Sequence, residues 1–326
     1  MIAVVIPFYQ RQPGILAKAL RSVFRQQHVE NVTVYVVDDA SPVTAESELM
    51  TIASSARFPV KIICQKNAGP GAARNKALDS VPHEANYVAF LDSDDEWSDD
   101  HLANATAALS SGYDFYFTDL YHLGQTVSAF QRAKRIVLAE HPLLRGSAFL
   151  HEYRGDMFDQ ILRGNVIGTP SVVYNFSRFA TLRFHTEFTH AGEDYLMWME
   201  FSRRGARFAF SSKCEVRCGE GVNVYTGSGW GTDAHPVRIQ NEIRYRQMTG
   251  SVFTVTAEQR RFLSGKIAEL RVAFVRDMLH RLAHRKRIPT RLLLAQLKLD
   301  PMTLVLLVPI AVRIASSALR TPEKIQ

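Results

Sequence analysis

The first 120 residues alternate between two apolar patterns. Continuous apolar runs, which predict buried strands, are followed by segments whose apolar side chains recur at helical spacing. Strands and helices that alternate in this way predict an α/β fold with a mostly parallel central sheet and helices on both faces. The expected strands are 2–8, 32–39, 60–65, 87–92 and 113–121, and the expected helices are 13–27, 44–56, 71–81 and 98–112.

The pattern is less regular beyond residue 121. We expect helices at 156–163 and 193–204, strands at 171–175 and across 207–218, and a glycine-rich loop at 219–233. From residue 236 the chain has a helical pattern, with one long helix expected at 256–284. The sequence therefore predicts a domain of residues 1–235, followed by a helical, basic C-terminal region of residues 236–326.

The net charge of +7 is unevenly distributed. Residues 260–326 contain 14 Lys and Arg against 4 Asp and Glu, so this part carries +10 and the rest of the chain −3. A basic segment can bind nucleic acid or an anionic membrane surface. Nucleic acid is disfavoured, because the basic segment has no interleaved aromatic residues for stacking on bases.

The C-terminal region also contains the most apolar run of the chain, residues 304–319. This run has 16 residues and includes Pro309 and Arg313, so it falls short of the ~20 apolar residues that cross a bilayer. Upstream lie a basic segment at 280–291 and an amphipathic one at 291–299. We expect an anchor on the surface of an anionic membrane. The alternative is an ordinary helical subdomain or an oligomer contact.

The cellular location is predicted from the cysteines and the N-terminus. The three cysteines, Cys64, Cys214 and Cys218, are too few for a disulfide framework and favour a reducing compartment. The N-terminal segment has no basic residue before its short apolar run, so we expect a first strand there and no signal peptide. These features predict a cytoplasmic protein.

Polar residues follow each of the first four expected strands. They lie at 9–10, 38–39, 66–67 and 92–96. In a parallel sheet of this kind, the ligand binds outside the carboxyl ends of the strands. Four separate segments are therefore expected to line one crevice.

The most charged of these segments is "FLDSDDEW", residues 90–97, with carboxylates at positions 92, 94, 95 and 96. Three explanations fit such a cluster. In the first, the carboxylates cap the next helix or are solvated. In the second, they form a phosphatase-type nucleophile pair. In the third, they hold a divalent metal whose shell a substrate phosphate completes. The phosphatase motif normally ends the first strand of its domain, whereas here the cluster follows the fourth.

Five blocks carry a resemblance to a known family: "VVIPFYQ", "VYVVDDASP", "NAGPGAARNKAL", "FLDSDDEW" and "GEDYLMW". In order and spacing they resemble the signature blocks of family 2 glycosyltransferases of the GT-A fold, over roughly residues 1–235. The resemblance implies transfer of a sugar from a nucleotide diphosphate donor to a hydroxyl group, with inversion. Within the family, the pattern is most similar to exopolysaccharide glucosyltransferases of the succinoglycan type.

The resemblance also implies a metal cofactor. A divalent ion, Mg²⁺ or Mn²⁺, would neutralise the charge that develops on the leaving diphosphate. The family pattern implies Asp94 as the first metal ligand, with Asp92 as a second ligand that also contacts the donor ribose.

Further donor-site residues follow from the matching blocks. Asp39 is expected to accept a hydrogen bond from a uracil ring, since a carboxylate offers only acceptors. Tyr9 is expected beside the base, Pro7 shapes that turn, and Asn67 belongs to a tight turn before the third helix. Gln10 departs from the asparagine usual in the family, and its role stays open.

Two charged residues complete the expected site. Arg74 is assigned to the donor phosphates, with a plain ion pair to Asp92 or Asp94 as the alternative. Asp194 matches the base that takes the proton of the acceptor hydroxyl. The alternative for Glu193 and Asp194 is an acid pair that caps a helix.

The expected partners are a UDP-sugar, with glucose as the expected sugar, and a polyprenyl-linked oligosaccharide at the inner face of a bacterial membrane. Assembly of lipopolysaccharide or capsule is an alternative to exopolysaccharide. A rival from another class is a nucleotidyltransferase that forms sugar nucleotides, but the segment "PFYQRQPG" after the first strand lacks the glycine-rich signature of that class.

Overall fold

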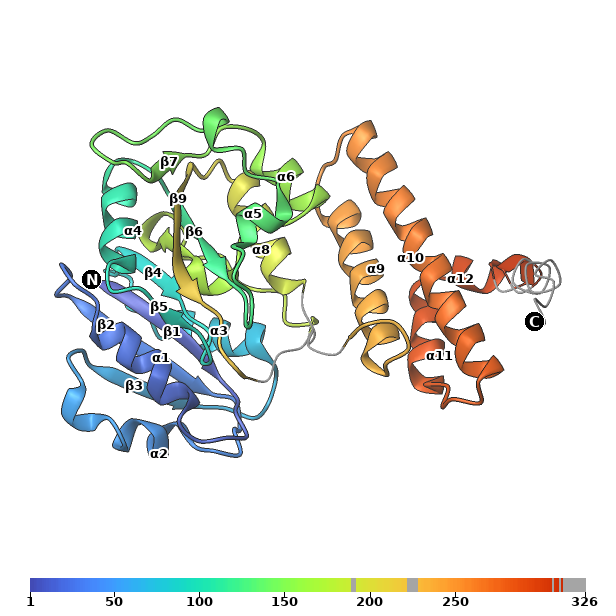
Figure 1. The fold of residues 1–326 in the computed structure, drawn as a ribbon, viewed down its shortest axis with the longest axis horizontal. Helices are drawn as coiled ribbons and strands as arrows, with labels where there is room; N and C mark the ends of the chain where they lie inside the picture. Colours follow the sequence, from blue (N-terminus) through green and yellow to red (C-terminus); the bar gives the residue numbers. More distant parts are fainter. Residues whose placement is uncertain (189–191, 222–227, 307, 311, 313–326) are drawn as a thin grey trace, which may run out of the picture. The chain divides into compact units, whose positions relative to one another are not determined.

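The computed structural model describes residues 1–188, 192–221, 228–306, 308–310 and 312 (Figure 1). They form two compact units. The first contains the described residues 1–188 and 193–221, and the second contains residue 192 and the described residues from 228 onward. Helix α9 (Ala234–Val252), which includes the expected division at 235/236, lies in the second unit, and that division stays a prediction.

The first unit is built on one sheet, with strand order β3-β2-β1-β4-β8-β6-β9-β5 and β7 paired to β9. Its strands are β1 (Ile2–Phe8), β2 (Val32–Asp38), β3 (Val60–Cys64), β4 (Tyr87–Phe90), β5 (Glu96–Trp97), β6 (Phe115–Tyr121), β7 (Leu150–Glu152), β8 (Val173–Asn175) and β9 (Phe208–Arg217). The α/β prediction and the first five expected strands are confirmed.

The direction of the strands changes half-way across this sheet. Strands β1 to β4 are parallel to one another, whereas β8 is antiparallel to both β4 and β6. Strand β6 therefore points the same way as β4, and β9 is parallel to β6. The sheet is thus mixed in its second half, and the carboxyl ends of β1, β2, β4, β6 and β9 lie at one edge.

The helices of the first unit are α1 (Ile15–Phe24), α2 (Ala45–Met50), α3 (Pro70–Leu78), α4 (His101–Ser110), α5 (Ala129–Ala133), α6 (Met157–Arg163), α7 (Phe176–Phe179) and α8 (Glu193–Arg203). Helix α1 buries Leu16, Leu20 and Val23, the face that the helical spacing predicts, in one core cluster with β1 and β2. Helix α3 begins with Pro70 after Gly69, whose φ of 88° lies in the region that favours glycine.

The second unit contains α9, α10 (Ala257–Ala283), α11 (Thr290–Leu299) and α12 (Met302–Val305). Helices α9 and α10 lie side by side (Figure 1). A capping box of Thr256 and Gln259 starts α10, and the expected long helix at 256–284 is confirmed. The core of this unit consists of Ile239, Ile243, Ile267, Phe274 and Met278.

Among the residues that the structure describes, no single helix has the length and apolar character to cross a bilayer. The helices Thr290–Leu299 and Met302–Ile310 together have that length and apolar character, but the chain bends by 108° between them.

Candidate active site

The aspartate cluster lies in the turn between β4 and β5, at the sheet edge where the parallel strands end. The turn is closed by the Asp95 backbone N–H, which donates to the Asp92 carbonyl at 3.0 Å. Burial, and next the charge of Asp92, raise the pKa of Asp94 to about 6. Burial, and next Asp92 and Asp94, raise the pKa of Asp95 well above its usual range. Without a cation, this turn therefore concentrates more negative charge than it readily holds.

The segment after β9 packs directly on this turn. Gly219 donates its backbone N–H to Asp95 Oδ1 at 3.0 Å. A Cβ atom added at Gly219 would overlap the Asp94 carbonyl, and one added at Gly221 would overlap the Asp94 carboxylate. Both positions therefore need glycine. The family motifs did not point to these two glycines. The sequence signal for them is the segment "CGEG" at residues 218–221.

The aspartates fit a hard divalent cation. Magnesium is typically held by one or two carboxylates together with substrate phosphates, and not by a complete protein cage. Among the residues that the structure describes, no group of three or more His, Cys, Asp or Glu forms such a cage. Asp94 and Asp92 supply oxygen ligands, and their crowding favours a bound cation. They are the residues that would hold Mg²⁺ or Mn²⁺.

Arg74 on α3 connects the aspartate turn to α8. Its side chain is 4% exposed, and its two terminal nitrogens contact Asp92 Oδ1 at 2.6 Å and Glu193 Oε1 at 3.3 Å. The guanidinium carbon lies 5.3 Å from the centre of the Phe184 ring. The ion pair with Asp92, which the sequence left as an alternative, is thus present, and a second carboxylate shares it.

Glu193 and Asp194 form the first turn of α8. Asp194 Oδ1 accepts the Tyr195 backbone N–H at 2.9 Å, and Thr169 Oγ1 lies 3.4 Å from Asp194 Oδ2. Burial, and next the charge of Glu193, raise the pKa of Asp194 to about 7. A carboxylate with that pKa is well placed to accept a proton near neutral pH. Thr169 has no signal in the family motifs, and sequence reasoning missed it.

Asp39 is buried and accepts hydrogen bonds from the turn before α3. Its carboxylate accepts from Gln65 Nε2 and from the backbone N–H groups of Ala68 and Gly69, each at 2.8 Å. Asn67 donates its side-chain amide to the Asp39 carbonyl at 3.0 Å. Asp39 and Asn67 therefore shape one turn together, and the contact of Asp39 with uracil stays a prediction. A carboxylate has about four acceptor positions, so a further donor is compatible with this arrangement.

Tyr9 and Pro7 lie at the carboxyl end of β1, each partly exposed. Next to them, Gln10 is 4% exposed and donates its side-chain amide to Ser93 Oγ at 3.1 Å. Gln10 thus links the end of β1 to the aspartate turn, a role that the sequence left open.

The site residues therefore come from the segments that the sequence pointed to. Contacts join Asp39 to Asn67, and they join Arg74 to both Asp92 and Glu193. Asp95 packs against the segment after β9. Asp38 serves the fold, because its carboxylate accepts the backbone N–H groups of Ser41 and Ala45.

Comparison with known proteins identifies the family. The model of Glycosyl transferase family 2 matches residues 3–180. The chain belongs to this family. It is 35% identical over 237 residues to the succinoglycan biosynthesis protein ExoW of Rhizobium meliloti, a match that covers 69% of this chain and 70% of that protein. It is 23% identical to the putative teichuronic acid glycosyltransferase TuaG of Bacillus subtilis, over 63% and 73% of the two chains.

Solved structures of other glycosyltransferases share the fold. TarS 1–349 of S. aureus is 16% identical, with a TM-score of 0.57 over 84% of this chain and 72% of that one. The mannosyltransferase PcManGT of Pyrobaculum calidifontis, solved with GDP-Man and Mn²⁺, is 17% identical, with a TM-score of 0.54 over 99% and 88%. The predicted GT-A fold is confirmed, and so is the prediction of a glycosyltransferase over a nucleotidyltransferase.

A first prediction concerns Arg74. Arg74→Met leaves the Glu193 carboxylate buried with no compensating charge, so the free energy of unfolding should fall by about 3–5 kcal/mol. Urea unfolding at neutral pH measures this change.

The matched control is Arg25→Met. Arg25 pairs with Asp99 at 3.3 Å, but both side chains are about half exposed, so the loss there should be under about 1 kcal/mol. Equal losses for the two variants would show that the buried pairs of Arg74 do not stabilise the fold as argued.

Proposed function

We propose that the protein transfers a sugar from a UDP-sugar to a lipid-linked oligosaccharide, with inversion, during exopolysaccharide synthesis. The main support for the proposal is the pair of ion contacts that Arg74 makes with Asp92 and Glu193. They connect the aspartate turn to the start of α8, where the candidate base Asp194 lies. The similarity to ExoW supports exopolysaccharide as the product and, with it, glucose as the expected sugar. TarS has been solved with UDP and with UDP-GlcNAc, which supports a uridine donor.

On the donor side, the leaving group is a nucleoside diphosphate whose negative charge increases as the glycosidic bond breaks. A bound Mg²⁺ or Mn²⁺ supplies Lewis-acid stabilisation of that charge. Asp94 and Asp92 would hold the ion, and Arg74 keeps Asp92 in position through the 2.6 Å contact. Asp39, Asn67, Tyr9 and Pro7 lie at the neighbouring strand ends, where the uridine is expected.

On the acceptor side, one base is enough for inversion. The acceptor hydroxyl attacks the anomeric carbon as its proton passes to Asp194, and the bond to the diphosphate breaks on the opposite face. Thr169 lies next to the second oxygen of Asp194 and fixes which oxygen faces the acceptor. Glu193 remains paired with Arg74 and is a positioning residue.

Other bacterial glycans are the second candidate product. The relatives include GgaA of Bacillus subtilis, named for minor teichoic acid biosynthesis, and AmsB of Erwinia amylovora, named for amylovoran biosynthesis. Their names favour a surface polymer in general, which also covers capsule and lipopolysaccharide. In each case the acceptor offers a sugar hydroxyl to the same base.

The second unit supports a cytoplasmic enzyme bound to the inner face of the membrane. Helix α11 packs Leu292, Leu293 and Leu299 against the core of its unit, but Leu294 is 60% exposed. The segment after α11 exposes Leu304, Val305 and Val308. Exposed basic residues occur in the same region, at 285–287, 291 and 298. Apolar and basic side chains together match an anionic lipid surface.

A second prediction tests the metal. Asp94→Asn should lower UDP release, measured with a panel of UDP-sugars and membrane extract as acceptor, by at least about a hundredfold, because a Lewis acid contributes several kcal/mol to such a step. EDTA should have the same effect on the unaltered enzyme, and Mg²⁺ or Mn²⁺ should reverse it. Asp99→Asn, in an exposed ion pair, is the control. If neither EDTA nor Asp94→Asn changes UDP release, the proposed metal mechanism is wrong.

A third prediction follows from the raised pKa of Asp194. The base works only when ionised, so kcat/KM should fall about tenfold per pH unit below pH 7 and level off above it. Asp194→Asn should lower kcat by about 10²–10⁴-fold above pH 7 and should remove the dependence on pH. Thr169→Val removes the hydrogen bond to the ionised carboxylate and should move the midpoint to higher pH. A flat profile between pH 5 and 8 argues against Asp194 as the base.

A fourth prediction concerns the membrane. The full chain should sediment with phosphatidylglycerol vesicles and not with phosphatidylcholine vesicles, and salt should weaken binding. The triple variant Leu304→Glu, Val305→Glu and Val308→Glu should lose binding, because it puts charge where apolar contact is needed. Met50→Glu, at a position 78% exposed in the first unit, is the matched control. If the triple variant and the control sediment equally, Leu304, Val305 and Val308 do not anchor the chain to the membrane.

A further inference from the structure

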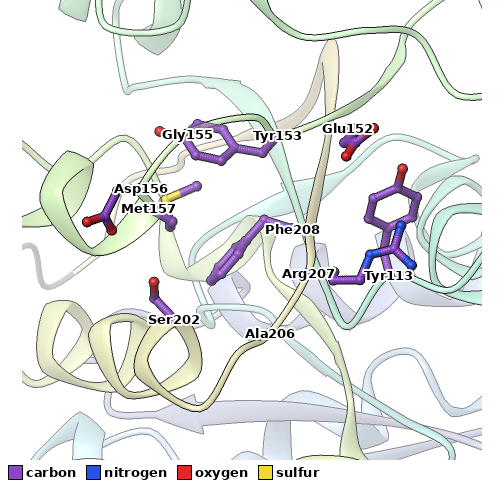
Figure 2. A pocket seen from close by; sticks show the side chains of 10 residues that line it. All are labelled: Tyr113, Glu152, Tyr153, Gly155, Asp156, Met157, Ser202, Ala206, Arg207 and Phe208. Carbon is purple, nitrogen blue, oxygen red and sulfur yellow. The ribbon is translucent and has the colours of Figure 1, made fainter.

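The first unit contains a pocket that the mechanism does not use (Figure 2). Its volume is about 290 Å³. Its walls include three aromatic rings and three charged side chains: Tyr113, Tyr153, Phe208, Glu152, Asp156 and Arg207. We call it the Tyr153 pocket.

The Tyr153 pocket lies at the sheet edge opposite the candidate active site. Tyr113 precedes the first residue of β6, and Phe208 is the first residue of β9. The aspartate turn leads into β5, which pairs with Val216 and Arg217 at the far end of β9. A strand of ten residues is about 30 Å long. A ligand in the Tyr153 pocket is therefore separate from the donor.

The aromatic and apolar side chains of the pocket are already ordered. Phe208 and Met157 are 5% and 2% exposed and contribute buried apolar side chains. The Tyr153 ring stacks on His141 at 4.8 Å between ring centres, and the Arg207 guanidinium lies 4.6 Å from the centre of the Tyr113 ring. These contacts fix both tyrosine rings before any ligand arrives, which lowers the entropic cost of binding.

Polar groups stand at both ends of the pocket. Figure 2 shows Glu152, Arg207 and Tyr113 at one end and Asp156 and Ser202 at the other. Carboxylates accept hydrogen bonds, whereas the guanidinium and hydroxyl groups donate them. Arg207 is held in place, since it donates to the Gly112 carbonyl at 3.1 Å. A ligand therefore meets hydrogen-bond acceptors and donors beside the rings of Tyr113, Tyr153 and Phe208.

These properties select one class of ligand. Two carboxylates disfavour an anion such as a nucleotide, and Arg207, which covers one tyrosine ring, disfavours a cation. A sugar ring is neutral, with hydroxyl groups around its edge that donate and accept and an apolar C–H face that packs on an aromatic ring. The volume is at the lower limit of the ~300–1,000 Å³ typical of ligand sites and fits one or two such rings.

We propose that the Tyr153 pocket is a second binding site, which holds a neutral sugar unit of a glycan away from the active site. The carboxylates of Glu152 and Asp156 accept hydrogen bonds from its hydroxyls, and the tyrosine and phenylalanine rings contact its apolar face. The inference goes beyond the proposed transfer reaction, because binding at this site needs neither donor nor metal.

Saturation-transfer NMR with the full chain tests the proposal. The probes are neutral tetrasaccharides of glucose, galactose, mannose and N-acetylglucosamine, without UDP and with EDTA. At least one probe should bind, and excess UDP should not displace it. Glu152→Gln removes a charged acceptor and should weaken binding about tenfold. Ser202→Tyr fills the pocket from α8 and should abolish binding.

Two controls separate this site from the active site and from misfolding. Glu30→Gln, an exposed acid elsewhere in the first unit, should bind like the unaltered chain, and so should Asp94→Ala. Thermal unfolding of each variant shows whether it is folded. The proposal is overturned if no tetrasaccharide binds, if Glu152→Gln and Ser202→Tyr bind normally, or if Asp94→Ala or UDP abolishes binding. None of these results bears on the proposed transfer reaction, which is measured by UDP release.

Discussion

The two buried ion pairs of Arg74 are the interaction on which the candidate active site depends. Arg74 comes from α3, Asp92 from the turn after β4, and Glu193 from the start of α8, 119 residues further along than Arg74. A single buried cation thus connects the aspartate turn to the start of α8. Burying the Arg74 guanidinium costs free energy unless both carboxylates stay close to it. The positions of α3, the turn after β4 and the start of α8 therefore depend on one another.

The aspartate turn shows the same coupling of charge and packing. Asp94 lies under the glycines that follow β9, and Asp95 accepts the Gly219 N–H. Larger side chains at 219 or 221 would push this segment off the turn. The ligands of the expected metal therefore depend on a segment far away in sequence, which holds the turn in shape while its carboxylates repel one another.

The sequence was sufficient for the early strands and for the charged residues, because both leave local signals. Apolar runs marked β1 to β4, and motif spacing marked Asp92, Asp94 and Asp194. It was not sufficient for the reversed strand β8, since the residue pattern of a three-residue strand does not show the direction of its partner. It also missed Thr169, Gly219 and Gly221, whose importance comes only from contacts with Asp194 and Asp94 that the fold creates. For Arg74 the sequence allowed either a contact with the donor phosphates or an ion pair with an aspartate. Only the structure shows that Arg74 pairs with Asp92 and Glu193 at the same time.

The charge of the chain divides near residue 260, with +10 in residues 260–326 and −3 in the rest. A site of the proposed kind receives a diphosphate and a cation, and it therefore needs carboxylates as well as an arginine. The part of the chain that supplies this site then has no large positive excess. For the proposed anchor, attraction to anionic lipid is worth about 1 kcal/mol per Lys or Arg near the surface, and it decays within a Debye length of about 10 Å. Under the proposed function, the +10 and the −3 thus answer two separate requirements, which an even spread of +7 would meet less well.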